Sequence, residues 1–175
     1  MSTTIPPIVV MGVQGSGKST IGTLLAARLG VAFVDGDRLH SPENVAIMAA
    51  GNALTDAERE PWLREVGRAL AENATTGIVI ACSALKRSYR DLLRESAPEL
   101  FIVYPEGSME LVSARIGARI HEFMPAGLLQ SQFDTLEPLQ SDERGVTVDI
   151  ALSPAQIIDE LAEALGAVGD RRHAH

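Results

Sequence analysis

Short apolar runs recur along the chain and are separated by longer amphipathic stretches. The runs expected to form strands are residues 8–11, 31–35, 78–82, 101–104 and 146–150. Apolar runs of this length, joined by segments long enough for a crossover, are typical of parallel strands that helices cover on both faces. The pattern therefore predicts an α/β fold in three layers, with a five-stranded parallel sheet between two layers of helices.

Two helix starts are marked by capping boxes, Thr-Asp-Ala-Glu at residues 55–58 and Ser-Pro-Ala-Gln at residues 153–156. A further helix is expected from Leu85, where apolar residues recur at helical spacing. The last helix is predicted to end at Gly166, and residues 168–175 are expected to form a frayed tail.

The most specific motif follows the first apolar run. Residues 12–19, Gly-Val-Gln-Gly-Ser-Gly-Lys-Ser, match the G-x-x-x-x-G-K-[ST] pattern of a P-loop between a predicted strand and a predicted helix. Backbone N–H groups and the helix dipole then face phosphate oxygens, while Lys18 reaches the β- and γ-phosphates and the Ser19 hydroxyl ligates Mg²⁺. ATP or GTP is the expected ligand. The residues assigned to nucleotide contacts here are Gly12, Gly15, Ser16, Gly17, Lys18, Ser19 and Thr20.

Composition narrows the class of protein. Fifteen basic and 23 acidic residues give a net charge of −8, which disfavours a protein that binds nucleic acid or membrane surfaces. The single cysteine, Cys82, excludes an internal disulfide and is expected to be a small buried residue. No apolar run is long enough to predict a signal or a membrane span. We therefore expect a single cytoplasmic domain over residues 1–175.

Ligands of parallel sheets lie beyond the carboxyl ends of the strands, so polar residues at those ends are site candidates. Asp35 and Asp37 follow the second predicted strand and suit Mg²⁺ binding and proton acceptance from a hydroxyl, although a solvated Asp-Gly turn is the alternative. Lys86, Arg87 and Arg90 follow the third predicted strand. Cations at a helix start oppose the helix dipole, so an anionic substrate explains them better than helix stabilisation does.

A pair of arginines follows the fourth predicted strand. Ser108 is expected to cap a helix that carries Arg115 and Arg119 on one face. Arginines so placed suit contacts with a nucleotide base and phosphates, with a solvated surface as the alternative. The segment at about 120–140 is then expected to be a lid that closes over the phosphates and excludes water.

This ordered series of motifs resembles the gluconate kinase family, a group of P-loop kinases related to shikimate and adenylate kinases. The resemblance covers about residues 8–165. Its motifs are residues 12–20, 35–40, 54–56, 59–63, 81–87, 89–91, 123–125, 128–133 and 135–137. It implies transfer of the ATP γ-phosphate to the 6-hydroxyl of D-gluconate, giving ADP and 6-phosphogluconate for the pentose phosphate or Entner–Doudoroff route. It also implies a homodimer.

The resemblance further implies residue roles. Asp35 would support Mg²⁺, and Asp37 would orient or deprotonate the acceptor hydroxyl. Arg115 would stack on adenine, and Arg119 would contact phosphates, so that Lys18, Asp37 and Arg119 form the expected catalytic set. The expected gluconate contacts are Asp37, His40, Arg59, Lys86, Arg87 and Arg90. Arg87 and Arg59 are favoured for the carboxylate, because a planar guanidinium matches it bidentately.

The chain departs from the family pattern in the expected lid, where His121-Glu122-Phe123 replaces Gly-His-Phe. Glu122 is expected to pair with an arginine such as Arg119, while His121 takes over the polar contact. Another small hydroxy acid or sugar acid therefore remains open as the acceptor. A nucleotide-binding regulatory switch is the alternative of a different class, but a switch has no use for an acceptor pocket.

Overall fold

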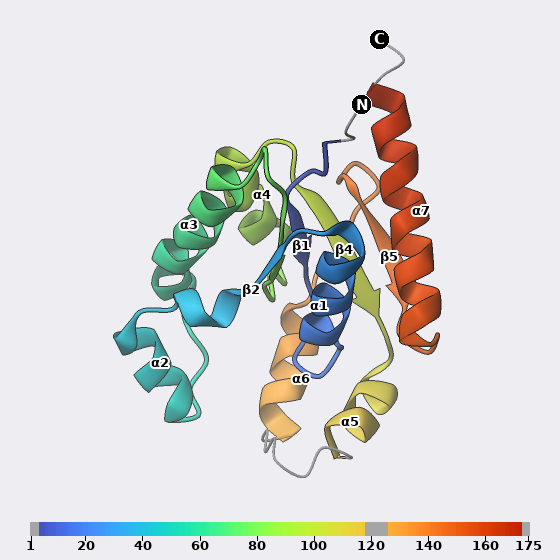
Figure 1. Ribbon diagram of the computed structural model, residues 1–175. Coiled ribbons are helices and arrows are strands. Elements are labelled where there is room, and N and C mark those ends of the chain that lie inside the picture. Colours follow the sequence, from blue (N-terminus) through green and yellow to red (C-terminus); the bar gives the residue numbers. More distant parts are fainter. Residues whose placement is uncertain (1–3, 118–125, 173–175) are drawn as a thin grey trace.

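The computed structural model describes residues 4–117 and 126–172 and has a parallel sheet at its centre (Figure 1). The strands lie in the order β2-β3-β1-β4-β5 and all pair in parallel. Their bounds are β1 (Ile8–Val10), β2 (Ala32–Asp35), β3 (Ile78–Ala81), β4 (Phe101–Glu106) and β5 (Gly145–Asp149). The predicted five-stranded sheet is confirmed. Since β1 pairs with both β3 and β4, the loop that follows β1 opens at the middle of the sheet edge.

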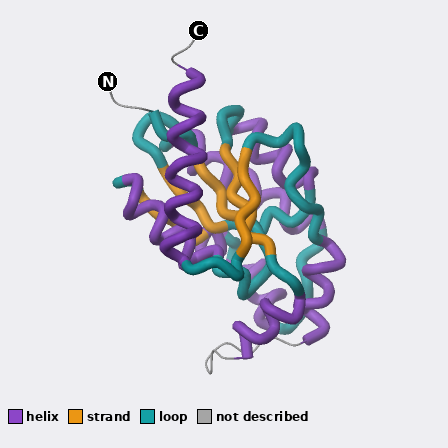
Figure 2. Tube along the Cα trace, turned by 90° about the vertical axis from the view of Figure 1, so that its right-hand side faces the viewer, coloured by secondary structure: helices purple, strands orange, loops and turns teal. Residues whose placement is uncertain are grey.

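Helices cover both faces of the sheet, which confirms the predicted three layers (Figures 1 and 2). One face packs α1 (Lys18–Leu29) and α7 (Pro154–Arg172) around a buried cluster that includes Leu25 and Leu161. The other face packs α3 (Asp56–Glu72) and α4 (Arg87–Ser96) around a cluster that includes Leu63. These apolar faces are the ones that helical spacing indicates in the sequence.

Shorter elements gather beyond the carboxyl ends of the strands. They are a 3₁₀ turn (Gly36–Leu39), α2 (Pro42–Ala49), α5 (Met109–Gly117) and α6 (Ala126–Thr135). Ser108 caps α5 as expected, because its hydroxyl accepts a hydrogen bond from the N–H of Leu111 at 3.1 Å. Among the described residues, no helix is both long and apolar enough to cross a membrane.

One prediction about helices needs correction. The last helix does not end at Gly166 but continues to Arg172. A single glycine costs a helix only about 1 kcal/mol relative to alanine, and the stop requires a left-handed backbone that Gly166 does not adopt. The segment expected as a lid contains α6, whose Leu129 is buried beside Val13 and Val112. Residues 118–125, which include Arg119, His121 and Glu122, lie outside the described residues.

Candidate active site

The loop between β1 and α1 forms the P-loop that the sequence predicts. Gly17 adopts a left-handed φ of 93° immediately before α1, a conformation that side chains other than glycine rarely tolerate. The Ser16 hydroxyl donates to the carbonyl of Val13 at 2.7 Å and braces the loop from within. The N–H of Gly12 donates to the carbonyl of Ser83 at 3.1 Å. The P-loop is thereby tied to the segment that follows β3.

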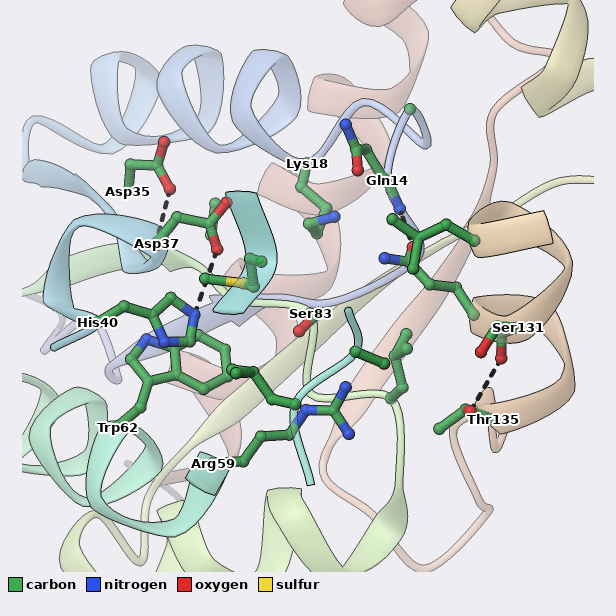
Figure 3. Close-up of a pocket in the computed structure, with 18 of the residues that line it drawn as sticks. Gln14, Lys18, Asp35, Asp37, His40, Arg59, Trp62, Ser83, Ser131 and Thr135 are labelled. Atoms are coloured by element: carbon green, nitrogen blue, oxygen red, sulfur yellow. Dashed lines mark hydrogen bonds and ion pairs between the residues drawn. The ribbon is translucent and has the colours of Figure 1, made fainter. Parts of the chain in front are cut away.

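Lys18 is the first residue of α1, and its side chain turns back toward this loop (Figure 3). Its ammonium donates to the carbonyls of Gly12 at 2.9 Å and Val13 at 3.0 Å. Burial lowers the pKa of Lys18, whereas the nearby carboxylates of Asp37 and Asp35 act to raise it. A nucleotide phosphate that replaces the two carbonyls offers the ammonium a full negative charge. The lysine is therefore poised to exchange loop contacts for phosphate contacts.

A cavity of about 720 Å³ opens beside Lys18 at the carboxyl ends of the strands. Its walls come from the P-loop, the β2–α2 region, the start of α3, the segment after β3 and the helix α6. The residues predicted for the site that line this cavity are Gly15, Gly17, Lys18, Ser19, Thr20, Asp35, Asp37, His40 and Arg59. Gly12 and Ser16 form the base of the same loop through the hydrogen bonds given above. One cavity therefore joins the phosphate-binding loop to three of the six expected acceptor residues, Asp37, His40 and Arg59.

Asp35 and Asp37 follow β2 on one side of the cavity (Figure 3). The Asp35 carboxylate accepts the N–H of Asp37 at 3.0 Å and caps the 3₁₀ turn, which fixes the direction of the second carboxylate. One Asp37 oxygen lies 4.0 Å from Nε2 of His40. Both aspartates line the cavity, and the Asp37 side chain is 78% exposed within it.

His40 is buried against Trp62, with the two rings stacked at a centroid distance of 4.0 Å. The indole N–H of Trp62 donates to the carbonyl of Gly36 at 2.8 Å and holds the stack under the 3₁₀ turn. Burial lowers the pKa of His40, and the positive charge of Arg59 lowers it further against the opposing effect of Asp37. His40 is thus a neutral polar wall of the cavity at neutral pH.

Arg59 projects from the first turns of α3 into the cavity (Figure 3). Its Nη1 donates to the Tyr89 hydroxyl at 2.7 Å. Lys86, expected in the same site, does not line the cavity and pairs with Asp56 at 3.4 Å. Of the basic residues expected to bind the acceptor, Arg59 is therefore the one that lines the cavity.

The structure does not bring Arg87, Arg90 or Arg115 to the cavity. Arg87 forms a bidentate pair with Asp142, at 2.8 and 3.1 Å, and also contacts Asp91. Arg90 is fully buried against Glu143, at 2.7 and 2.9 Å. Arg115 donates to the carbonyl of Ile150. In this structure these three guanidinium groups contact other parts of the fold and do not line the cavity. The sequence alone does not show these acidic and carbonyl partners.

Polar residues of α6 line the cavity although the sequence reasoning gave them no role. Ser131, Gln132 and Thr135 face the cavity, and the Gln132 side-chain oxygen accepts the N–H of Gln14 in the P-loop at 2.7 Å. Their spacing on one helical face, together with Leu128, is the signal that was available.

Cys82 is buried as expected, and burial raises the pKa of its thiol to about 12, which suits a packing role.

Comparisons with known proteins agree with this geometry. A family model described as shikimate kinase matches residues 14–166. The chain is 39% identical over 168 residues to the thermosensitive gluconokinase of Escherichia coli, covering 94% of this chain and 89% of that protein. It is 45% identical over 156 residues to the gluconokinase of Gluconobacter oxydans, covering 88% of each. The crystal structure of a gluconokinase from Sinorhizobium meliloti matches with a TM-score of 0.91 and 44% identity, over 99% of this chain and 100% of that one.

The sheet order, the P-loop and the match of the shikimate kinase model define the class, a P-loop kinase that uses ATP. Within that class the relatives identify the family, because the gluconokinases are similar to this chain over nearly its whole length. The chain belongs to the gluconokinase family.

Proposed function

We propose that this protein transfers the γ-phosphoryl group of ATP to the 6-hydroxyl of D-gluconate, releasing ADP and 6-phosphogluconate. One observation carries the proposal beyond family membership. A single cavity presents the P-loop lysine, the carboxylate of Asp37 and the guanidinium of Arg59. These are the groups needed to neutralise the transferred phosphoryl group, to receive a hydroxyl proton and to bind a carboxylate.

Different residues of the cavity act on the two ends of the acceptor molecule. The Asp37 carboxylate takes the proton of the 6-hydroxyl as the oxygen forms its bond to the γ-phosphorus, and the bond from that phosphorus to the β-phosphate oxygen breaks. Lys18 neutralises negative charge on the oxygens of the phosphoryl group while it is transferred, and ADP is released. Arg59 holds the carboxylate at the other end of the acceptor. His40 and Trp62 form the wall between Asp37 and Arg59 and exclude water from that side.

The residues present fit a magnesium ion that arrives with the nucleotide. Among the described residues, no group of three or more His, Cys, Asp or Glu side chains converges as a metal cage. Mg²⁺ in kinases needs few protein ligands, since phosphate oxygens and water complete its octahedron. Ser19 at the start of α1 and Asp35 across the cavity would hold it, and it would supply charge neutralisation at the phosphates.

The test is an ADP-release assay coupled to NADH oxidation, with Mg-ATP and D-gluconate as substrates. We expect ADP release to depend on gluconate and to exceed the release seen with shikimate or adenosine monophosphate. ADP release that shikimate or another hydroxy acid accelerates, and gluconate does not, would overturn the assignment of the acceptor. Slow hydrolysis that no acceptor accelerates would favour the regulatory switch.

Three further properties follow from the family resemblance as part of the same proposal. The protein supplies 6-phosphogluconate to the pentose phosphate or Entner–Doudoroff route, acts in the cytoplasm and forms a homodimer. The dimer is tested by sedimentation of the purified protein, where a monomer at micromolar concentration would overturn that part.

A further inference from the structure

Four side chains join the start of α3 to the start of α4 beside the cavity. We call Asp56, Arg59, Lys86 and Tyr89 the α3–α4 cluster. The Tyr89 hydroxyl donates to Asp56 and accepts from Nη1 of Arg59 at 2.7 Å. Lys86 pairs with Asp56 at 3.4 Å, and the tyrosine ring lies beneath both cations, 5.4 Å from the Arg59 guanidinium carbon and 5.5 Å from the Lys86 ammonium. The reaction scheme above uses only Arg59 of these four.

The direction of each hydrogen bond in the α3–α4 cluster is fixed by chemistry. An ionised carboxylate can only accept and a guanidinium can only donate, so the Tyr89 proton points to Asp56 and an oxygen lone pair points to Arg59. Burial and the bond to Asp56 both raise the pKa of Tyr89, which keeps this hydroxyl protonated. The tyrosine therefore connects Arg59 to Asp56 in one orientation.

The α3–α4 cluster leaves part of Arg59 available to a ligand. Nη1 is engaged by Tyr89, whereas within residues 4–117 and 126–172 no acceptor is found for Nε or Nη2. The side chain is 22% exposed and lines the cavity. Arg59 and Lys86 carry two positive charges against the one negative charge of Asp56. A single planar anion with two oxygens matches the free guanidinium edge.

We propose that Tyr89 and Asp56 are positioning residues that hold the free edge of Arg59 toward the cavity and thereby make the acceptor site select an acid over a neutral polyol. An arginine side chain has many rotamers, and holding it before the acceptor arrives reduces the entropy lost on binding. This inference rests on the proposed function, because it names the residues behind the recognition of the gluconate carboxylate.

The first experiment compares two tyrosine variants in the ADP-release assay. Tyr89→Phe removes the hydroxyl and keeps the ring, so the KM for gluconate is expected to rise about 10- to 150-fold, the range for a lost hydrogen bond to a charged group. The KM for ATP and the kcat are expected to stay within about 2-fold, since Lys18 and Asp37 are untouched. Tyr104→Phe is the matched control, because Tyr104 is the other tyrosine of the chain and is buried in β4 away from the cavity.

A second readout separates positioning from loosened structure. D-Glucitol has the carbon length of gluconate but no carboxylate, so its inhibition constant against gluconate should be the same for wild type and Tyr89→Phe. Asp56→Asn should raise the KM for gluconate in the same direction. In the double variant the two losses should be less than additive, because both residues act through one guanidinium.

The outcomes distinguish this inference from the proposed function. Wild-type protein without gluconate-dependent ADP release would overturn both. Active wild type with the same KM for gluconate in Tyr89→Phe and Tyr104→Phe would overturn the inference alone. Parallel changes in the glucitol inhibition constant and in the KM for ATP would also overturn it, since they would mean a general distortion of the cavity.

Discussion

Lys18 is held by two carbonyls of its own loop, so its contribution to phosphoryl transfer can be tested at a single side chain. Lys18→Met keeps the aliphatic chain and removes the charge that neutralises the γ-phosphate. Turnover is expected to fall by about 10²-fold or more, measured by gluconate-dependent ADP release. Arg28→Met, a cation in the last turn of the same helix, is the control and should keep wild-type turnover. A Lys18→Met enzyme that retains more than about a tenth of wild-type turnover would contradict the P-loop assignment.

The neighbouring carboxylates make separable contributions. Asp37→Asn should lower turnover by about 10²-fold with a smaller change in the KM for ATP, because the amide cannot take the hydroxyl proton. Asp35→Asn is the comparison, and it should act on nucleotide and metal dependence, seen as a raised magnesium requirement. If Asp37→Asn weakens ATP binding as much as it lowers turnover, then Asp37 and not Asp35 serves the metal.

At the scale of elements, the P-loop is shaped by its contact with α5. Gly15 has a φ of 81°, and a β-carbon there would lie 2.5 Å from Cγ1 of Ile116. Gly15→Ala therefore combines backbone strain with a steric overlap, and the KM for ATP is expected to rise at least about 10-fold. Gly30→Ala is the matched control, since Gly30 has a φ of 69° but open space around it.

The Gly30→Ala variant should lose about 1 kcal/mol of stability and keep the wild-type KM for ATP. Shortening the neighbour in Gly15→Ala/Ile116→Ala should restore part of the ATP affinity, because the overlap is relieved while the strain remains. If Gly15→Ala and Gly30→Ala change the KM for ATP by the same factor, backbone strain alone accounts for the change and the contact with α5 does not contribute.

The elements that the sequence predicts well are those whose signal is local. The strands, the capping boxes and the P-loop are each specified within a few residues, and all of them are confirmed. α2 was not predicted although Ser41 and Pro42 carry its start signal, and the Ser41 hydroxyl accepts the N–H of Asn44 at 3.2 Å. α6 was also not predicted, because the composition of its segment is typical of a mobile lid.

The site residues follow a similar rule. Asp37 was predictable from its place after a strand, whereas Arg59 was expected only from the family resemblance, and both line the cavity. Arg87 and Arg90 were assigned to the acceptor, but their partners Asp142 and Glu143 lie more than 50 residues away along the chain. A basic residue after a strand looks the same in sequence whether it faces a ligand or a buried carboxylate.

At the scale of the whole molecule, Arg90 links the segment after β3 to the segment before β5. Its Nη1 donates to the carbonyl of Ala84 at 3.0 Å, where the backbone has an unfavourable φ of 40°. The other side of the guanidinium pairs with Glu143, which also accepts from Arg94 at 2.6 Å and from the N–H of Gln140 at 2.8 Å. Since Ser83 of the same segment accepts the N–H of Gly12, this buried pair supports the floor of the P-loop.

Glu143 should therefore make the stability of the whole fold depend on pH. Burial tends to raise the pKa of Glu143, but the bonds from Arg90, Gln140 and Arg94 outweigh it and take the pKa from 4.5 to about 2. Because this pKa is lower in the folded state, the stabilisation is fully present above pH 4.5 and is lost as the pH falls toward 2.

Glu143→Gln leaves Arg90 buried without its counter-charge, so the free energy of unfolding at pH 7, measured in urea, should fall by about 3–5 kcal/mol. The difference in the free energy of unfolding between wild type and Glu143→Gln should become smaller as the pH is lowered from 5 toward 2, the range set by the pKa shift. Glu65→Gln is the control, because its pair with Arg68 at 2.6 Å is exposed and worth at most about 1 kcal/mol. A gap that stays constant with pH would show that packing at Glu143, and not its charge, supports the fold.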